Sequence, residues 1–182
     1  MGRQHAGSNR VGRDQRGGLL GFTEVASVFD GTIGGLEKRK RDYEAGRHGL
    51  NLVFDKDDEV TAWVASKLPI PFKAEDFGSC STIGMSDKSG KLVAGCVYHM
   101  WRPFDCQVTF ASVTPRWVLP MNLAPLFHYP FVQRGLSRIT LTIGANNTNA
   151  LRTNLRIGFK WEGRARKAYD GTNDAIILGM LR

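Results

Sequence analysis

The pattern of residues 146–182 constrains the fold of this chain most strongly. Four apolar residues fall on one side of a short helix, and these are Ala150, Leu151, Leu155 and Ile157. Asn147 or Thr148 can cap the start of this helix, and Gly158 suits a helix end in a left-handed conformation. The residues from 159 to 168 and from 175 to 181 then alternate as two strands around the turn DGTND. A short helix followed by a β-hairpin is typical of an α/β domain.

Nine residues of this stretch also occur in a recognisable order: Asn147, Ala150, Arg152, Gly158, Phe159, Glu162, Gly163, Arg166 and Asp174. They match N-x-x-[AS]-x-R, then G-F-x-x-E-G-x-x-R and a late Asp. This pattern resembles the GNAT superfamily of N-acetyltransferases, in the branch that acetylates protein N-termini and ribosomal proteins. The resemblance implies the GNAT fold, an α/β fold with a mixed, mostly antiparallel central sheet flanked by helices.

The stretch from residue 49 to 182 reads as one domain with this fold, because 182 residues supply one good hydrophobic core. Acidic residues begin a predicted helix at 55–69, which ends at a proline. Strands are predicted at 50–54, 81–86, 91–101, 105–113 and 138–144, in addition to the two that close the chain. In the strand at 105–113, Cys106, Val108 and Phe110 are predicted to point inward.

Residues 1–48 differ in composition and are predicted to form an extended N-terminal arm. Residues 1–18 are rich in Gly and Arg, an apolar group follows, and residues 36–48 form a charged helix candidate. The arm is predicted to bind a neighbouring subunit or a nucleic acid. The residues predicted to make these contacts are Arg3, Arg10, Arg13, Arg16, Leu19, Leu20, Phe22 and Phe29.

Charge and cysteine content narrow the classes of protein further. The net charge of +8 and pI near 9.7 fit an acidic or polyanionic partner, although charge alone is a weak signal. Cys80, Cys96 and Cys106 have neither an even count nor C-x-x-C spacing, so neither a disulfide framework nor a metal site is predicted. This use of cysteine predicts a reducing compartment, and the expected location during synthesis is the cytoplasm. The sequence has no apolar run of membrane-spanning length.

The resemblance implies acetyl-CoA as the cofactor if the protein is active. Main-chain groups of Ala111, Ser112 and Val113, with Asn147 and Asn154, would lie at the cofactor, and residues 114–122 would form its phosphate-binding loop. Glycines let backbone amides approach phosphate oxygens, yet this loop reads TPRWVLPMN and contains none. Arg116 is the possible phosphate partner, acting by charge. An exposed arginine with no ligand is an equally good interpretation.

The residues available for acid-base chemistry are few. Asn154 stands where many members of the superfamily carry a tyrosine that protonates the departing thiolate, and an amide cannot act as that acid. Candidate bases are His99 and Glu162, with Asp105 as a third. Each also has a structural interpretation: His99 as a hydrogen-bonded strand histidine, Asp105 as a turn residue, and Glu162 as the ion-pair partner of Arg164 or Arg166.

Two functions from different classes follow. In the first, the chain is a structural component of an oligomeric assembly that docks through its arm and has weak or no acetyltransferase activity. Resemblance to small phage-encoded GNAT-fold proteins suggests a bacteriophage virion, at the head-tail connector or tail. In the second, the chain is an active acetyl-CoA-dependent N-acetyltransferase that modifies a protein amine. Nucleic-acid contact by the arm ranks third.

Overall fold

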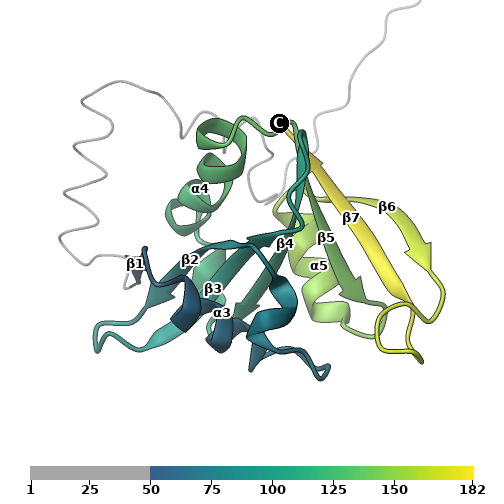
Figure 1. The fold of residues 1–182 in the computed structure, drawn as a ribbon, viewed down its shortest axis with the longest axis horizontal. Helices are drawn as coiled ribbons and strands as arrows, with labels where there is room; N and C mark the ends of the chain where they lie inside the picture. Colours follow the sequence, from purple (N-terminus) through teal and green to yellow (C-terminus); the bar gives the residue numbers. More distant parts are fainter. Residues whose placement is uncertain (1–49) are drawn as a thin grey trace, which may run out of the picture.

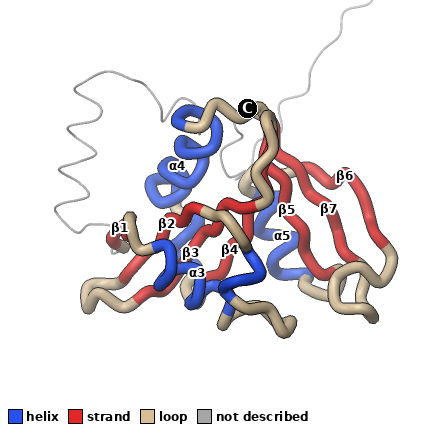
Figure 2. Tube along the Cα trace, in the orientation of Figure 1, coloured by secondary structure: helices blue, strands red, loops and turns tan. Residues whose placement is uncertain are grey.

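The computed structural model describes residues 50–182, and the predicted arm of residues 1–48 lies outside the described residues together with its partner-binding side chains. The described chain contains one seven-stranded sheet with the strand order β1-β2-β3-β4-β5-β7-β6 (Figures 1 and 2). Its strands are β1 (Asn51–Val53), β2 (Ser81–Ser86), β3 (Leu92–His99), β4 (Asp105–Ser112), β5 (Arg138–Gly144), β6 (Lys160–Ala165) and β7 (Ala175–Leu181).

Helices cover both faces of this sheet. The helical segments are α3 (Asp57–Ala65), η1 (Ala74–Phe77), η2 (Pro115–Val118), α4 (Pro120–His128), η3 (Tyr129–Gln133) and α5 (Thr148–Arg156). Helix α3 and η1 pack on one face in a small core, whereas α4 and α5 pack on the other in a larger one. In Figure 1, α4 stands at the top of the sheet and α5 lies behind β5.

All neighbouring strands run antiparallel except β4 and β5, which run parallel. The predicted fold class, a mixed and mostly antiparallel sheet flanked by helices, is therefore confirmed. Alternation along β4 buries Cys106 and Val108 and partly buries Phe110, as predicted. The predicted helix at 55–69 is shorter in the structure, since α3 ends at Ala65.

Two glycines in the strands beneath α3 let this helix approach the sheet closely. A Cβ atom on Gly95 would lie 2.7 Å from a methyl group of Val64, and one on Gly84 would lie 2.8 Å from a methyl group of Val60. Any side chain at these positions would push the helix outward. Asp57 also links α3 to β2, because its Oδ1 accepts hydrogen bonds from both the N–H and the hydroxyl of Thr82, each at 2.8 Å.

The helical path after β4 contains two prolines, Pro125 and Pro130, at positions where proline ordinarily interrupts a helix. Helix α4 continues through Pro125, and Pro130 lies in the five-residue π-helical turn η3. Pro125 falls in the second turn of α4, where its missing N–H removes a single helical hydrogen bond. Apolar burial on the core side compensates, because Leu123, Leu126 and Phe127 are all buried.

The C-terminal unit folds as its residue pattern predicts. Asn147 caps α5 by accepting a hydrogen bond from the N–H of Ala150 at 3.1 Å, and Gly158 follows the helix with a φ of 116°. Phe159, which is 1% exposed, packs against the ring of Phe127 on α4. The helix and hairpin of this unit thus complete the larger core.

Candidate functional site

The two central parallel strands separate part-way along their length. Pairing between β4 and β5 spans only three residue pairs and ends at Gln107 and Thr140 (Figure 1). Beyond that point the N–H of Val113 donates to the carbonyl oxygen of Val93 on β3. The main-chain groups of successive residues in a strand point to opposite sides, so those of Phe110 and Ser112 point away from β3 and towards β5. This divergence therefore presents main-chain groups with which an extended ligand could pair.

The loop after β4 has its amide groups engaged within the chain. The N–H groups of Thr114, Arg116, Leu119, Asn122 and Leu123 all donate to acceptors inside the loop or to Ser112. Pro115 and Pro120, which lie between them, have no N–H to offer. A phosphate site at a helix start depends on converging, unused amides. Most of the amides that would have to point at a phosphate here already donate hydrogen bonds within the chain.

A buried asparagine holds this loop closed. The Nδ2 of Asn122 donates to the carbonyl oxygen of Arg116 at 2.8 Å, and the Asn122 residue is only 2% exposed. The bond ties the first turn of α4 to η2, so the loop is a compact double turn. Sequence reasoning missed this role. An Asn two residues into a helix that begins with proline was the available signal.

Aromatic side chains pack where the loop meets β4. The ring of Trp117 lies 5.3 Å from that of Phe110, with an angle of 30° between the planes. Both residues are partly buried and pack against the larger core. The indole therefore covers the side of β4 on which α4 begins. Offset aromatic pairs of this kind stabilise a protein beyond simple area burial.

The predicted cofactor-binding residues of this region lie as follows. Ala111 packs towards the α3 core, and Val113 is exposed. Ser112 donates its hydroxyl to the carbonyl oxygen of Thr114 at 2.7 Å. Arg116 is exposed on η2, which leaves its guanidinium accessible to an anion. Their contact with a cofactor stays a prediction.

The two asparagines predicted at the cofactor belong to α5. Asn147 uses its side-chain oxygen to cap the helix. Asn154 is buried, and its Nδ2 donates to the carbonyl oxygen of Ala150 at 2.9 Å. Its Oδ1 is buried without a hydrogen-bond partner within the described chain. An orphaned acceptor of this kind costs about 1 to 3 kcal/mol, and the amide supplies no acidic proton.

His99 lies on β3 beneath η1. One ring nitrogen is 3.0 Å from the hydroxyl of Thr109, and the ring of Phe77 packs edge-on against the imidazole with centroids 5.0 Å apart. Burial lowers the pKa of His99 to about 4, so the imidazole is neutral at pH 7. It lies beside Gln107, where β4 and β5 are still paired. Its catalytic role stays a prediction.

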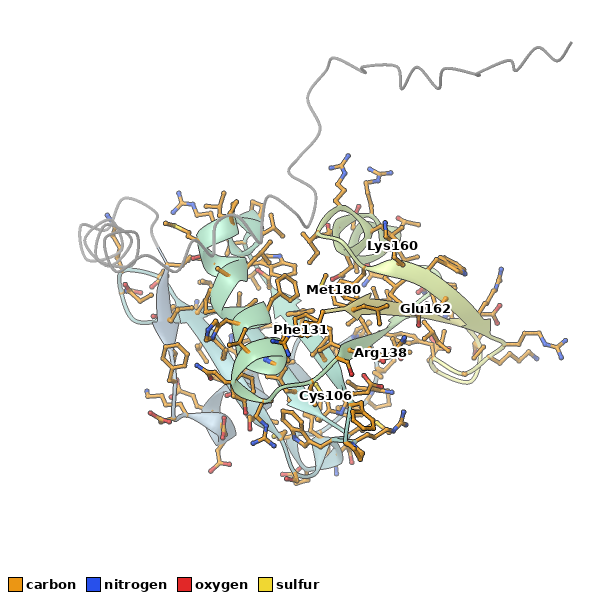
Figure 3. The ribbon with its side chains drawn as sticks, turned by 90° about the horizontal axis from the view of Figure 1, so that it is seen from above. Cys106, Phe131, Arg138, Lys160, Glu162 and Met180 are labelled. Carbon is orange, nitrogen blue, oxygen red and sulfur yellow. The ribbon has the colours of Figure 1, made fainter. Side chains whose placement is uncertain are left out.

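Glu162 belongs to a network of charges on the sheet. Both its carboxylate oxygens accept hydrogen bonds from Arg138, one of them at 2.9 Å, and the Arg138 Nε donates to Thr140 (Figure 3). The hydroxyl of Thr140 in turn donates to Asp105 at 3.0 Å. The hydrogen bond from Arg138 lowers the pKa of Glu162. A carboxylate held in this way is a weaker base.

The network explains a glycine in the strand between these residues. Strand β7 separates β5 from β6, so Arg138 and Glu162 meet above it, at Gly179. A Cβ atom on Gly179 would lie 2.7 Å from the guanidinium of Arg138. Asp174, another residue of the C-terminal pattern, pairs with Arg164 at 2.6 Å. The sequence suggested Arg164 or Arg166 as the partner of Glu162, whereas the structure gives Arg138.

Cysteine and metal chemistry find little support in the described chain. Burial raises the pKa of Cys106 to about 12 and that of Cys96 well above its ordinary value. Both thiols lie in the core, which confirms the predicted inward position of Cys106. Residues 50–182 contain no group of three His, Cys, Asp or Glu side chains able to hold a metal ion. None of their helices is long and apolar enough to cross a bilayer.

No family model matches the sequence, and no curated protein matches it either. Solved structures, in contrast, do match this chain. A probable acetyltransferase superposes with a TM-score of 0.56 at 15% identity, covering 74% of this chain and 93% of that one. A GNAT-family acetyltransferase from Bacillus anthracis gives 0.53 at 20% identity, covering 72% and 94%. The chain has the GNAT fold.

A third GNAT-fold structure is the spermidine/spermine N-acetyltransferase SpeG from Vibrio cholerae, in a mutant form. It superposes with a TM-score of 0.57 at 11% identity and covers 72% of this chain and 94% of that one. Identities this low establish the fold alone. On the GNAT fold, the divergence of β4 and β5 and the loop at residues 114–122 together make the candidate acetyl-CoA site.

Proposed function

We propose that this chain uses the GNAT fold as a structural component of a larger protein assembly and has little or no ability to bind acetyl-CoA. The observation that carries the proposal is the closed loop after β4. Its amides are bonded within the chain, Asn122 ties it to the start of α4, and Trp117 stacks on Phe110. Binding a pyrophosphate there would require several of these contacts to break.

Calorimetry tests this directly. Acetyl-CoA titrated into the full chain is expected to give no binding heat up to about millimolar ligand, the weak limit at which binding free energy is about −4 kcal/mol. Micromolar binding that disappears in Arg116→Ala would overturn the proposal. Lys73→Ala is the matched control, because Lys73 is also an exposed cation but lies in the loop before η1.

The finer part of the proposal concerns the assembly. The N-terminal arm would dock on neighbouring subunits through its arginines and apolar residues, with nucleic acid as a further contact. The identity of the assembly as a bacteriophage virion, at its head-tail connector or tail, rests on sequence resemblance alone. Deletion of residues 1–48 is expected to abolish incorporation into the assembly. Unchanged incorporation would refute the docking role.

An active N-acetyltransferase is the second candidate, and the divergence of β4 and β5 favours it. Main-chain groups of Phe110 and Ser112 face the gap, where an extended pantetheine could pair with them. Acetyl-CoA would then be the donor, a protein amine the acceptor, and His99 or Glu162 the base. Transfer of labelled acetyl groups to lysine or N-terminal peptides would establish this function in place of the first.

A further inference from the structure

The charges of the described chain are distributed unequally along the sheet. Residues 50–137 carry eight Lys and Arg against eight Asp and Glu, whereas residues 138–182 carry eight against three. The entire net positive charge of the described chain therefore comes from residues 138–182. Strand β6 forms one edge of the sheet and β1 forms the other, and Figure 1 shows them at opposite sides.

The edge strand β6, together with the end of α5 and the turn that flank it in sequence, is basic, and we call this region the basic edge. Five exposed cations mark it: Arg152, Arg156, Lys160, Arg166 and Lys167. The ion pairs within residues 50–182 involve none of these five. Trp161 on β6 is 52% exposed among them. Because β6 is an edge strand of the described sheet, its outer side presents main-chain groups that no other strand of residues 50–182 pairs with.

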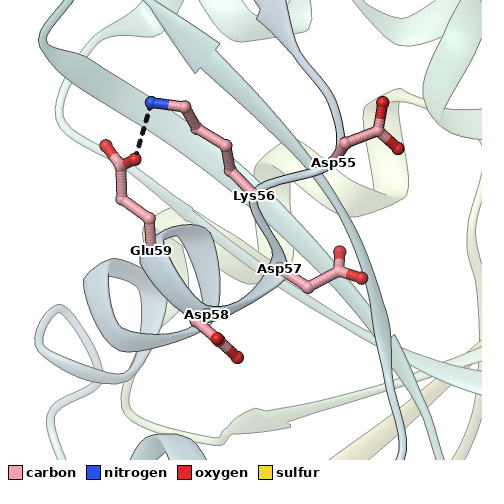
Figure 4. Close-up of a pocket in the computed structure, with 5 residues that line it drawn as sticks. All are labelled: Asp55, Lys56, Asp57, Asp58 and Glu59. Atoms are coloured by element: carbon pink, nitrogen blue, oxygen red, sulfur yellow. Dashed lines mark hydrogen bonds and ion pairs between the residues drawn. The ribbon is translucent and has the colours of Figure 1, made fainter.

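The opposite edge is acidic, and we call it the acidic edge. Asp55, Asp57, Asp58 and Glu59 cluster where β1 leads into α3, with Lys56 as the one intervening cation (Figure 4). Lys56 bonds Glu59 at 2.8 Å, and Asp57 bonds Thr82. Asp55 and Asp58 are exposed, and no ion pair of the described chain involves them. Asp55 precedes the helix, so helix capping does not account for it.

A cavity of about 430 Å³ adjoins this acidic cluster. Strand β1 pairs only with Gly84–Ser86 of β2, so residues 81–83 border the cavity together with the end of α4. Phe54, Asp55, Asp57 and Tyr129 are among the residues that line it. Carboxylates next to aromatic faces suit a cationic side chain, because both attract positive charge.

We infer that the partner of the acidic edge is a second copy of this chain, which presents its basic edge. The two surfaces are complementary in charge and lie at opposite edges of one sheet, so each copy can contact a different neighbour on either side. Such head-to-tail contacts close into a ring or extend as a filament. The inference goes beyond the proposed function, since it holds whether or not acetyl-CoA binds.

Sedimentation velocity of the full chain at several concentrations tests the inference. At about 50 mM salt the chain is expected to form species larger than monomer, and at about 500 mM these should dissociate, because salt screens exposed charges beyond a few ångströms. The net charge of +8 repels copies from one another at long range. Association that strengthens with salt would therefore overturn the proposal, as would a monomer at every concentration.

Charge reversal then locates the contact. Asp58→Lys changes the acidic edge and Arg156→Glu changes the basic edge, and each is expected to weaken self-association about tenfold or more, since like charges are brought together. Glu75→Lys and Lys73→Glu make the same charge changes on exposed residues of η1 and its N-terminal flank. Association that falls equally in these controls would contradict the assignment of the edges.

Mixing the two variants gives the most specific result. Asp58→Lys keeps its basic edge and Arg156→Glu keeps its acidic edge, so an equimolar mixture is expected to regain the association that each variant loses on its own. Continued absence of association in the mixture would overturn the head-to-tail arrangement. An oligonucleotide that binds the monomeric wild type but not Arg156→Glu would instead assign the basic edge to nucleic acid. The acetyl-CoA titration is unaffected by any of these outcomes.

Discussion

Two regions of this domain relate to the GNAT fold in different ways. The C-terminal unit, residues 146–182, keeps the helix cap at Asn147, the positive-φ Gly158 and the buried Phe159. The loop at residues 114–122 keeps its position after β4 but has no glycine and bonds its own amides. The first region builds the core, and the second would have to bind a cofactor.

The two regions differ in what constrains their residues. Residues that close a hydrophobic core are constrained by volume and by backbone geometry, so their pattern persists as long as the fold does. Residues of a phosphate-binding loop are constrained only by the ligand. Under the proposed function that constraint is absent, which leaves the loop to be stabilised by internal contacts such as the hydrogen bond of Asn122 and the aromatic contact of Trp117. A match in the first region therefore establishes the fold and leaves activity open.

The largest effect is expected from Phe159→Ala in the C-terminal unit. Removing a fully buried phenylalanine should lower the free energy of unfolding by about 3 to 5 kcal/mol, as measured by urea denaturation. Phe104→Ala is the matched control, because Phe104 is 72% exposed and should change stability by less than about 1 kcal/mol. Similar losses in both variants would contradict the packing role of this unit.

A smaller loss is expected from Asn122→Ala in the loop. The substitution removes one of the two donors to the carbonyl oxygen of Arg116, which still accepts from the N–H of Leu119, and the loss of this hydrogen bond should cost about 0.5 to 1.5 kcal/mol. Hydrogen exchange should also quicken at the amides of Leu119 and Leu123, which the closed loop protects. Asn149→Ala, at an exposed position of α5, is the control. If exchange at the loop amides stayed unchanged, the loop would not depend on Asn122.

The sequence predicted the strands and the closing helix because their alternation, caps and turn glycines are local properties. It also predicted the absence of a glycine-rich phosphate loop. It could not supply the bond from Asn122 to Arg116 or the meeting of Arg138 with Glu162 above Gly179. Those contacts join residues through the tertiary fold, and composition carries no signal of which strands will be neighbours. The path of α4 through Pro125 likewise depends on the tertiary fold, because core burial there outweighs one lost hydrogen bond.

The two candidate bases can be compared through pH. The pKa of His99 is about 4 in the folded protein, below its ordinary value near 6.5, so protons bind the unfolded chain more readily. Stability from the neutral imidazole is complete above about pH 6.5 and is lost as the pH falls towards 4. Between pH 7 and 5, wild type should lose about 1 to 2 kcal/mol more than His99→Gln. Parallel stability curves would show that His99 is not buried as a neutral ring.

The smallest effect is expected at Glu162, whose carboxylate is partly exposed and paired with Arg138. Glu162→Gln should lower the free energy of unfolding by less than about 1 kcal/mol, and the difference should shrink in high salt. The pKa of Glu162 is lowered in the folded protein, so this contribution is present above the carboxyl's ordinary pKa and disappears as the pH falls below it. Glu75→Gln, an exposed glutamate on η1, is the control. A salt-sensitive stability difference found at Glu162 and not at Glu75 would identify an ion pair that joins β5 to β6 across β7. Loss of acetyl transfer in Glu162→Gln, with stability unchanged, would instead make this carboxylate a base and favour the enzyme over the scaffold.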